Sequence, residues 1–389
     1  MLNSENLQKE VMLCYQCSKC NSVCPAFRIG EFSPRSFILK TSSEGFESVA
    51  RDPSIWGCRT CGMCNLCPML IDIPGVVMKA RAFAIKEDNL PVETKKGHRS
   101  LFNLAQKLQA NSFETIQTNK WPKPGQKFTE SGEIALFSGS MAYWNYLLYN
   151  YELDYISGLR AVLEALNRMD IVPAIPPDLK DSGHDLIHGG EEEDFIKIAR
   201  SNSDTLKVNG VKTIIAVNPE DYHTLKNIYP KYIQDFDFNV IFWTEFLVEN
   251  NFLEHIEYQI YLGNEIFVAY HDPCKLGRIN KIFDSPRLLL EGTPRVRLLS
   301  LEDEREDAPC CGVSAFIGCN DNSLFLRHER LKEVLDSEAD VLVSTCPACV
   351  LHFNCAYEST LYDDVKKSRK PLKIMELSTF IGKNIFNFD

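Results

Sequence analysis

The sequence lacks the features of a membrane span, of a nucleic-acid-binding protein and of a nucleotide-binding enzyme. No uninterrupted apolar run approaches the ~18–20 residues that a transmembrane helix requires. Acidic residues outnumber basic ones by 53 to 42, and the net charge of −11 disfavours a nucleic-acid partner. There is no Gly-x-Gly-x-x-Gly fingerprint after a strand and no Walker A motif, so nothing predicts a flavin, nicotinamide or nucleotide site. Met1 is followed by mostly polar residues, so no signal peptide is expected.

Cysteine, in contrast, is abundant, with 15 copies in 389 residues. Because no signal peptide is expected, we predict a cytoplasmic and reducing location, where thiols bind metals in preference to forming disulfides. Any contact with a membrane would then be peripheral, through a partner protein. Cys319 and Cys355 fit no motif and are predicted to be ordinary buried thiols. The other cysteines fall into three motifs.

Two of these motifs are runs of four cysteines that each end in Cys-Pro, at residues 14–25 and 58–68. Four-cysteine zinc sites are the alternative interpretation, but two complete runs of this kind favour iron–sulfur clusters. The first run resembles that of bacterial ferredoxins, in which three thiolates hold one [4Fe-4S] cubane and the fourth reaches its neighbour. The second run is one residue shorter before its last cysteine, which we interpret as a tightened turn. By this resemblance, one cubane is held by Cys14, Cys17, Cys20 and Cys67, and the other by Cys58, Cys61, Cys64 and Cys24.

The third motif combines cysteines from three separate segments of the carboxyl-terminal half. They are Cys274, the adjacent pair Cys310-Cys311, and the stretch from Cys346 to Cys349. Adjacent cysteines cannot easily bond to each other, but both can face one metal cluster. The pattern resembles the cysteine-rich CCG domain of heterodisulfide reductases and their relatives. The resemblance implies that these five cysteines hold one non-cubane [4Fe-4S] cluster.

The part of the chain after residue 130 is predicted to be a tandem pair of α/β repeats. Short apolar runs at 133–140 and 211–218 parallel those at 265–274 and 339–346, and helical stretches alternate with them. This alternation predicts parallel sheets. The positions of the first repeat that match the five cysteines carry no thiol, and hard oxygen ligands suit iron–sulfur clusters poorly, so this repeat is predicted to bind none. These positions are Ser140, Asp181, Ser182, Asn218 and Asp221.

Asp181 and Asp221 leave a second interpretation open. They could form a carboxylate pair for acid–base chemistry or for a hard cation. We favour the interpretation that they are polar replacements in a vacated cluster pocket.

The predicted fold class is therefore α/β, with a small helical domain in front. A ferredoxin-type domain with two [4Fe-4S] clusters spans 1–95, and a connector spans 96–130. A degenerate CCG repeat without ligands spans 131–250, and an intact CCG domain with the non-cubane cluster spans 251–389. The connector is polar and basic at its start, and we interpret it as a solvated linker. A docking strip for an acidic partner is the alternative.

Lys275 and Arg278 follow the first cysteine of the CCG motif and are the candidate catalytic residues. Relatives commonly carry histidine where Lys275 stands, so a group that titrates near neutral pH is replaced by a fixed cation. Lys275 is expected to stabilise an anionic reduced cluster or a thiolate leaving group. His271 is interpreted as structural, and His352 as a satisfied interior histidine.

The resemblance implies a component of a heterodisulfide reductase-like oxidoreductase complex. With one intact motif, the chain resembles the single-CCG branch that includes the K subunit of the sulfite-reduction membrane complex. Our first hypothesis is an electron-transfer subunit that relays electrons between the two cubanes and the non-cubane cluster. The alternative is a catalytic reductase that cleaves a heterodisulfide or a protein trisulfide at the CCG cluster. The expected partners are other redox chains: a flavoprotein, a hydrogenase, a formate dehydrogenase or a membrane cytochrome.

Overall fold

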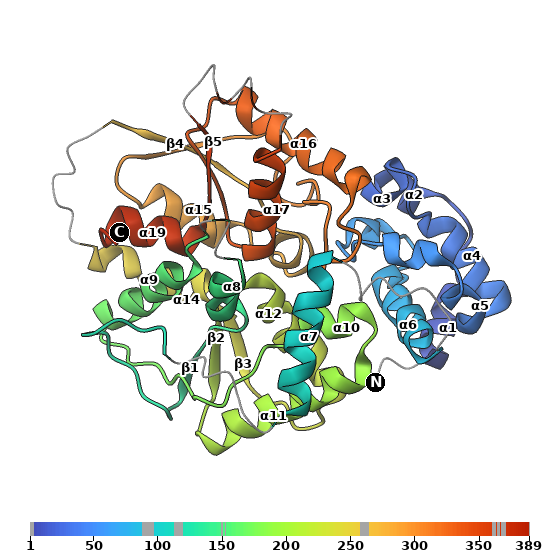
Figure 1. Ribbon diagram of the computed structural model, residues 1–389, viewed down its shortest axis with the longest axis horizontal. Coiled ribbons are helices and arrows are strands. Elements are labelled where there is room, and N and C mark those ends of the chain that lie inside the picture. Colours follow the sequence, from blue (N-terminus) through green and yellow to red (C-terminus); the bar gives the residue numbers. More distant parts are fainter. Residues whose placement is uncertain are drawn as a thin grey trace.

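The computed structural model describes most of the chain, namely residues 4–87, 97–112, 120–148, 151, 153–256, 264–359, 363, 366 and 371–388. In Figure 1 the amino-terminal helices, coloured blue, lie at one side of a larger α/β part that contains two sheets. Within the described ranges, no helix is both long and apolar enough to cross a membrane.

Three of the amino-terminal helices, α4, η1 and α6, start at a residue whose side chain caps the helix. In α4 the first residue is Pro34, and the preceding Ser33 hydroxyl accepts a hydrogen bond from the Ser36 amide. In α6 the Asp72 carboxylate accepts a hydrogen bond from the Gly75 amide. These elements are α1 (Ser4–Val11), α2 (Lys19–Val23), α3 (Pro25–Arg28), α4 (Pro34–Glu44), α5 (Phe46–Ala50), η1 (Pro53–Gly57), η2 (Met63–Leu66) and α6 (Ile73–Lys86).

The first sheet has three parallel strands in the order β1-β2-β3. In its register, Ile134 of β1 pairs with Thr213 of β2, which pairs with Asn239 of β3. Its elements are β1 (Ile134–Phe137), α8 (Met141–Leu147), α9 (Tyr155–Arg168), α10 (His184–Gly189), α11 (Glu192–Val208), β2 (Thr213–Ala216), α12 (Pro219–His223), η5 (Thr224–Ile228), α13 (Tyr229–Tyr232), β3 (Asn239–Phe242), α14 (Trp243–Glu249) and η6 (Phe252–His255).

The second sheet has four parallel strands in the order β5-β4-β6-β7. Val268 of β4 pairs with both Leu298 of β5 and Val341 of β6, so β4 and β6 are central strands, and β6 is buried throughout. The elements are β4 (Ile266–Tyr270), η7 (Lys275–Ile279), α15 (Asp284–Glu291), β5 (Val296–Leu299), α16 (Asp321–Asp336), β6 (Val341–Ser344), α17 (Pro347–Tyr357), β7 (Lys373–Glu376) and α19 (Leu377–Ile385).

The strand order β1-β2-β3 of the first sheet matches the order β4-β6-β7 of the second, in which β5 is an additional edge strand. Each of the four predicted apolar runs contains a strand, and the prediction of parallel sheets is confirmed. In both sheets the strands from the two runs are neighbours, β1 with β2 and β4 with β6, and a further strand, β3 or β7, continues directly into a helix. The division into tandem repeats and the four domain boundaries remain predictions.

Helices from one half pack on helices of the other. Helix α9 packs against α19, and α14 packs against α15. The Tyr155 hydroxyl on α9 donates a hydrogen bond to the Pro347 carbonyl on α17 at 2.7 Å. A single hydrophobic core therefore runs through both sheets, while a second core lies among the amino-terminal helices and includes Ala315 and Ile317 from the carboxyl-terminal half.

The interpretation of the connector as a solvated linker is wrong for its first half. Residues Gly97–Asn111 form helix α7, which lies along the first α/β unit in Figure 1. The Phe102 ring is fully buried against Trp144 and Phe316, at centroid distances of 5.3 and 4.1 Å. Polar side chains on the same helix are buried too, because they bond to acidic groups such as Glu191. Residues 113–119 lie outside the described part of the chain.

Candidate functional site

The first group of thiols lies at the surface of the amino-terminal domain. Cys17 is exposed, and Cys14, Cys20 and Cys67 are half-buried. Partial burial raises the pKa of Cys20, and the neighbouring thiolates of Cys14 and Cys67 raise it further. Cys67 therefore lies with the thiols of the first run, although it is the last cysteine of the second.

The second group of thiols is buried, and it combines one cysteine of the first run with three cysteines of the second. Cys24, Cys58, Cys61 and Cys64 are all buried. Burial raises the pKa of Cys24 to about 12, with further contributions from the charges of Cys61 and Cys58. Burial also raises the pKa of Cys64, followed by the charges of Cys58, Cys61 and Cys24. Cys24 of the first run thus lies among the cysteines of the second run.

The backbone turns in the same way around both groups. The residues on either side of Cys17 have positive φ, 61° at Gln16 and 69° at Ser18. The residues on either side of Cys61 do the same, at 44° for Thr60 and 74° for Gly62. Left-handed residues wrap the chain tightly, and such strained turns occur where a ligand must be enclosed. The sequence interpretation placed the cysteines on turns without identifying this paired geometry.

The third group brings together all five CCG cysteines. Cys274 lies beyond the carboxyl end of β4, and Cys346 lies beyond that of the neighbouring β6, where it is the N-cap of α17. The Cys310 thiol, from the loop between β5 and α16, is hydrogen-bonded with Cys274 and Cys311. Cys349 is hydrogen-bonded with Cys311 and Cys346. The five sulfur atoms therefore form one connected group, as is typical for ligands at the carboxyl edge of a parallel sheet.

The second and third groups touch. Cys310 is also hydrogen-bonded with Cys61, and this contact lowers the pKa of Cys61 to about 6. A cysteine of the amino-terminal domain and a CCG cysteine are therefore in direct contact. Their positions are almost 250 residues apart in the sequence, so no sequence pattern could have predicted the contact.

Lys275 and Arg278 hold this junction together. Both side chains are buried. Lys275 Nζ donates a hydrogen bond to the Thr60 carbonyl at 3.0 Å, and Arg278 Nη1 donates one to the Cys61 carbonyl at 3.0 Å. The Arg278 guanidinium also donates to the carbonyls of Glu306 and Ala308. The structure therefore gives Arg278 a connecting position, and a catalytic role for either residue remains a prediction.

Two histidines flank the CCG cysteines. His352 Nδ1 lies 3.9 Å from Cys311 Sγ, but His352 Nε2 has no hydrogen-bond partner within the described residues. The prediction of a satisfied interior histidine is therefore wrong for one of its two nitrogens. His271 is buried, and its ring packs edge-on against Phe353 at 4.8 Å, in line with a structural role.

The two cysteines outside the motifs are not both buried. Cys319 is exposed and Cys355 is half-buried, so the prediction of ordinary buried thiols is wrong for Cys319 and holds only in part for Cys355. Cys319 follows the turn at Ala315 and Phe316, whose φ angles are 49° and 55° and whose side chains are buried.

Known protein families match the two cysteine-rich parts of the chain. A family model described as a 4Fe-4S dicluster domain matches residues 13–72, and one described as a cysteine-rich domain, CCG, matches residues 268–354. A component of the dihydromethanophenazine:CoB–CoM heterodisulfide reductase of Methanosarcina barkeri is 25% identical, over 87% of each chain. The chain is an iron–sulfur protein related to heterodisulfide reductases.

Other similar proteins are named for different functions. A component of the fumarate reductase (CoM/CoB) of Methanothermobacter marburgensis is 25% identical over 92% of this chain and 70% of its own length. A probable membrane-anchored ferredoxin of Chromohalobacter salexigens is 25% identical over 86% of this chain, which spans only 55% of that relative. The resemblance to heterodisulfide reductases and the oxidoreductase character of the chain are therefore confirmed. The relatives differ in the substrates for which they are named.

The donor sets of this iron–sulfur protein fit the implied clusters. Thiolates are the soft ligands that iron–sulfur clusters take, and they are grouped here as four, four and five. The first two groups, from Cys14 to Cys67, would hold the clusters of the 4Fe-4S dicluster domain. The third group, from Cys274 to Cys349, would hold the remaining cluster.

The matching positions of the first half are occupied by hydrogen bonds between protein groups. The Ser182 hydroxyl donates to Asp221 Oδ1 at 2.5 Å, and the Tyr143 hydroxyl donates to Asp181 Oδ2 at 2.7 Å. Asn218 is the N-cap of α12, where its side chain accepts from the Glu220 amide. Buried Ser140 hydrogen-bonds with Asp181. That these positions bind no metal remains a prediction.

Sequence reasoning missed a group of buried histidines and carboxylates beside the CCG cysteines. His184 and His188 lie one turn apart on α10, with ring centroids 4.1 Å apart. The ring of His223 on α12 lies 6.5 Å from that of His184 and 6.1 Å from that of His188. The spacing of four residues between His184 and His188 was the available signal. Burial lowers the pKa of all three histidines, and the charge of Lys275 lowers it further.

A cavity of about 240 Å³ lies at the junction of the three parts of the molecule. Lys275 reaches it from the CCG side, and Lys275 Nζ lies 3.4 Å from His188 Nε2. Its other lining residues include Thr60 and Met78 of the amino-terminal domain, His188 of α10, and His223 and Lys231 of the segment from α12 to α13.

Proposed function

We propose that the chain is the electron-transfer subunit of a heterodisulfide reductase-like oxidoreductase complex. Two cubane [4Fe-4S] clusters would be held by the first and second thiol groups, and a non-cubane [4Fe-4S] cluster by the CCG cysteines. The observation that carries the proposal is the junction between the second and third thiol groups. Arg278 Nη1 donates a hydrogen bond to the Cys61 carbonyl at 3.0 Å, Lys275 Nζ donates one to the Thr60 carbonyl at 3.0 Å, and Cys61 lies beside Cys310.

The different burial of the three thiol groups supports a path for electrons between the surface and the interior of the molecule. Cys17 is exposed, whereas Cys61 and Cys310 are buried. An exposed centre can exchange electrons with another protein, and a buried centre is protected from water. Iron–sulfur clusters supply single-electron transfer when bound. The role of Lys275 and Arg278 would be to hold the two buried groups at a fixed separation.

The names of the relatives support a place within a larger assembly. Both the Methanosarcina barkeri and the Methanothermobacter marburgensis relatives are described as reductase subunits. We extend this to partner chains such as a flavoprotein, a hydrogenase, a formate dehydrogenase or a membrane cytochrome. The predicted division into a ferredoxin-type domain, a connector, a degenerate repeat and an intact CCG domain is part of the same proposal.

The relay is tested on the anaerobically purified full chain. Three clusters predict about twelve irons, and reduction by a low-potential dye should reach the cubanes before the CCG centre in freeze-quenched electron paramagnetic resonance (EPR) spectra. In the Cys58→Ser variant the CCG centre should be reduced several-fold more slowly, whereas Cys355→Ser should match the wild type. A CCG centre that is reduced at an unchanged rate in Cys58→Ser would contradict the relay, and about eight irons would mean that the CCG site is empty.

A second candidate function is favoured by the cavity beside Lys275. The chain would then be a catalytic thiol–disulfide reductase acting on a heterodisulfide or a protein trisulfide. For a disulfide, two electrons and two protons convert one S–S bond into two thiols. A buried lysine next to Cys274 could stabilise the first thiolate formed.

Turnover assays separate the two candidates. Dye-driven reduction of a disulfide or trisulfide by the single chain, lost in Lys275→Met and kept in the exposed variant Lys281→Met, would favour the reductase. The relay predicts no turnover without partner chains. Either candidate predicts that NADH and quinols fail to reduce the clusters of the single chain, since no nucleotide-binding motif is present.

A further inference from the structure

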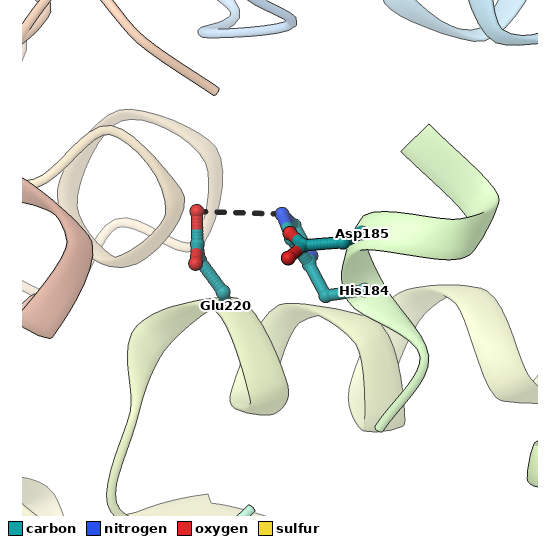
Figure 2. Close-up of side chains that lie close together, drawn as sticks. All are labelled: His184, Asp185 and Glu220. Carbon is teal, nitrogen blue, oxygen red and sulfur yellow. Dashed lines mark ion pairs between the residues drawn. The ribbon is translucent and has the colours of Figure 1, made fainter. Parts of the chain in front are cut away.

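Three buried side chains outside the cysteine motifs point toward one another. Figure 2 shows His184 and Asp185 on α10 facing Glu220 on α12. One ligand atom from each lies within 4.8 Å of the others. The exposed fractions are 2% for His184, 2% for Asp185 and 7% for Glu220, so water cannot easily solvate them.

The hydrogen bonds around His184 fix which ring nitrogen carries the proton. The Thr224 hydroxyl donates its proton to the Glu220 carbonyl at 2.8 Å. The same hydroxyl oxygen lies 2.9 Å from His184 Nδ1, and it must therefore accept the proton of Nδ1. His184 Nε2 is then left with a free lone pair. A second hydrogen bond that orients the ring in this way is the usual support of a metal-binding histidine.

The free lone pair of His184 Nε2 faces a carboxylate oxygen of Glu220, which is also a hydrogen-bond acceptor. His184 Nε2 lies 3.5 Å from Glu220 Oε1, as the dashed line in Figure 2 marks, and the nitrogen has no hydrogen-bond partner in the described structure. Two lone pairs facing each other in a buried site are unfavourable unless a cation or a proton lies between them. Two ligands that are each ~2.1 Å from a tetrahedral ion are about 3.4 Å apart, which matches the observed separation.

Asp185 adds a third unsatisfied ligand. Neither of its carboxylate oxygens has a hydrogen-bond donor within the described residues. The nearest cation is Arg99, whose Nη1 lies 3.7 Å from Asp185 Oδ2, beyond hydrogen-bonding distance. A carboxylate buried in this way is stabilised by coordination to a metal.

We propose that His184, Asp185 and Glu220 bind one divalent transition-metal ion of the kind that takes mixed nitrogen and oxygen ligands, such as Zn²⁺ or Fe²⁺. The imidazole ligand argues against Mg²⁺ and Ca²⁺, which take oxygen ligands, and the absence of a thiol from this set argues against an iron–sulfur cluster. The site is independent of the proposed relay, because it shares no ligand with the three thiol groups. It also differs from the five vacated positions, none of which is among its ligands.

The charges near this site are mixed. Lys275 disfavours a further cation. The thiolates of Cys346 and Cys274 lie within electrostatic reach of Glu220 and favour one, as does the second carboxylate, Asp185. The metal would therefore lie between the vacated pocket and the CCG cysteines. Three protein ligands are the number found in zinc sites that keep one position open for another ligand.

The test uses the full chain with its clusters in place. After chelator treatment, the protein is titrated anaerobically with Zn²⁺, and zinc and iron are measured by mass spectrometry. The wild type should bind about one zinc, whereas His184→Ala and Glu220→Gln should bind none at the same concentration. The matched control is His223→Ala, which removes a neighbouring buried histidine outside the set and should retain zinc.

A milder variant guards against misfolding. Thr224→Val removes the hydrogen bond that orients His184 and should weaken zinc binding about 10–100-fold. Unchanged iron content and EPR spectra in each variant show that the clusters and the fold are intact, and they report separately on the proposed relay. Anomalous scattering at the zinc edge should place the ion between α10 and α12.

Two results would overturn the site. One is equal zinc binding by the wild type and by His184→Ala, which would mean adventitious binding elsewhere. The other is a wild type that takes up no zinc and shows the infrared band of a protonated Glu220, absent in Glu220→Gln. A proton shared between Glu220 and His184 would then occupy the gap.

Discussion

At the scale of single residues, Cys24 links the two cysteine runs. It belongs to the first run by sequence but lies among the buried thiols of Cys58, Cys61 and Cys64. The Cys-Pro ending of each run had already suggested this exchange. The short gap before Cys67 did not prevent the reciprocal arrangement, because Cys67 lies with Cys14 and Cys20.

Replacing Cys24 should therefore damage the distant cluster. In Cys24→Ser the cubane at Cys58, Cys61 and Cys64 should change its EPR spectrum or lose iron, because serine supplies a harder ligand at that site. Cys319→Ser is the matched control, since this cysteine is exposed and outside the motifs. If only the signal of the Cys14–Cys20 cluster changed, the exchange of ligands would be wrong.

The sequence predicted single residues well where chemistry alone restricts them. The spacings of thirteen cysteines predict which thiols lie together, because thiols at these spacings have few other uses, and their assignment to individual clusters stays a prediction. The group of His184, Asp185 and Glu220 was missed because its members come from two helices, α10 and α12, that only the fold brings together. Lys275 and Arg278 were noticed, but the carbonyls that they bond belong to a distant segment.

At the scale of elements, α7 shows why polar segments are hard to interpret. Its Asn103 and Gln106 are buried because each bonds to a carboxylate, on Glu191 and Asp181 respectively. A sequence shows the polarity and not the partner, so a packed helix was interpreted as a solvated linker. The strands were easier to predict, because continuous apolar runs such as that of β6 need no partner to be recognised.

Phe102 on α7 should behave as a core residue. Phe102→Ala removes a ring stacked on Phe316, which lies in the loop that follows Cys311, and should lower the free energy of unfolding by about 3–5 kcal/mol. Leu104→Ala, on the exposed side of the same helix, should change it by less than about 1 kcal/mol. Anaerobic denaturant unfolding measures both, and equal effects would show that α7 is not part of the core.

Helix α19 begins at a buried acid that should make stability depend on pH. Burial raises the pKa of Glu376 to about 8, although its carboxylate accepts hydrogen bonds from the Ser378 and Thr379 amides. A carboxyl whose pKa is higher in the folded than in the unfolded chain favours folding when protonated. Its contribution is therefore complete below about pH 4.5 and is lost as the pH rises to about 8.

Glu376→Gln should remove this dependence. Relative to the wild type, the variant should gain stability between pH 5 and pH 8, measured by denaturant unfolding of the anaerobic protein at both values. Exposed Glu254→Gln is the control and should show no such trend. A difference between Glu376→Gln and the wild type that stays constant with pH would contradict the prediction.

At the scale of the whole molecule, the surface around the first thiol group is apolar. The exposed fractions are 53% for Leu13, 62% for Leu66 and 83% for Leu70, which lie close to Cys14 and Cys67 in the sequence, and Cys17 is exposed too. Exposed apolar side chains around a redox centre are typical of a docking surface. Under the proposed function, its occupant is a redox protein that exchanges single electrons with the first cubane.

Charged substitutions should disturb this docking without disturbing the clusters. Leu70→Glu and Leu66→Glu should slow cluster reduction by a co-purifying redox partner, whereas reduction by dithionite should be unchanged. Val208→Glu is the control, because Val208 is 86% exposed at the end of α11 and lies far along the chain from the cysteines. Equal rates in all three variants would show that the partner docks elsewhere.

The contact between Cys61 and Cys310 also constrains how the protein matures. During synthesis the amino-terminal domain emerges first, and under the proposed function its buried cluster site would be filled while Cys61 is still accessible. Once the carboxyl-terminal half closes over it, Lys275 and Arg278 seal the junction, and a cluster could enter only if the two halves separated again. Under the proposed function, cluster loading at the second thiol group would therefore have to precede closure of the two halves.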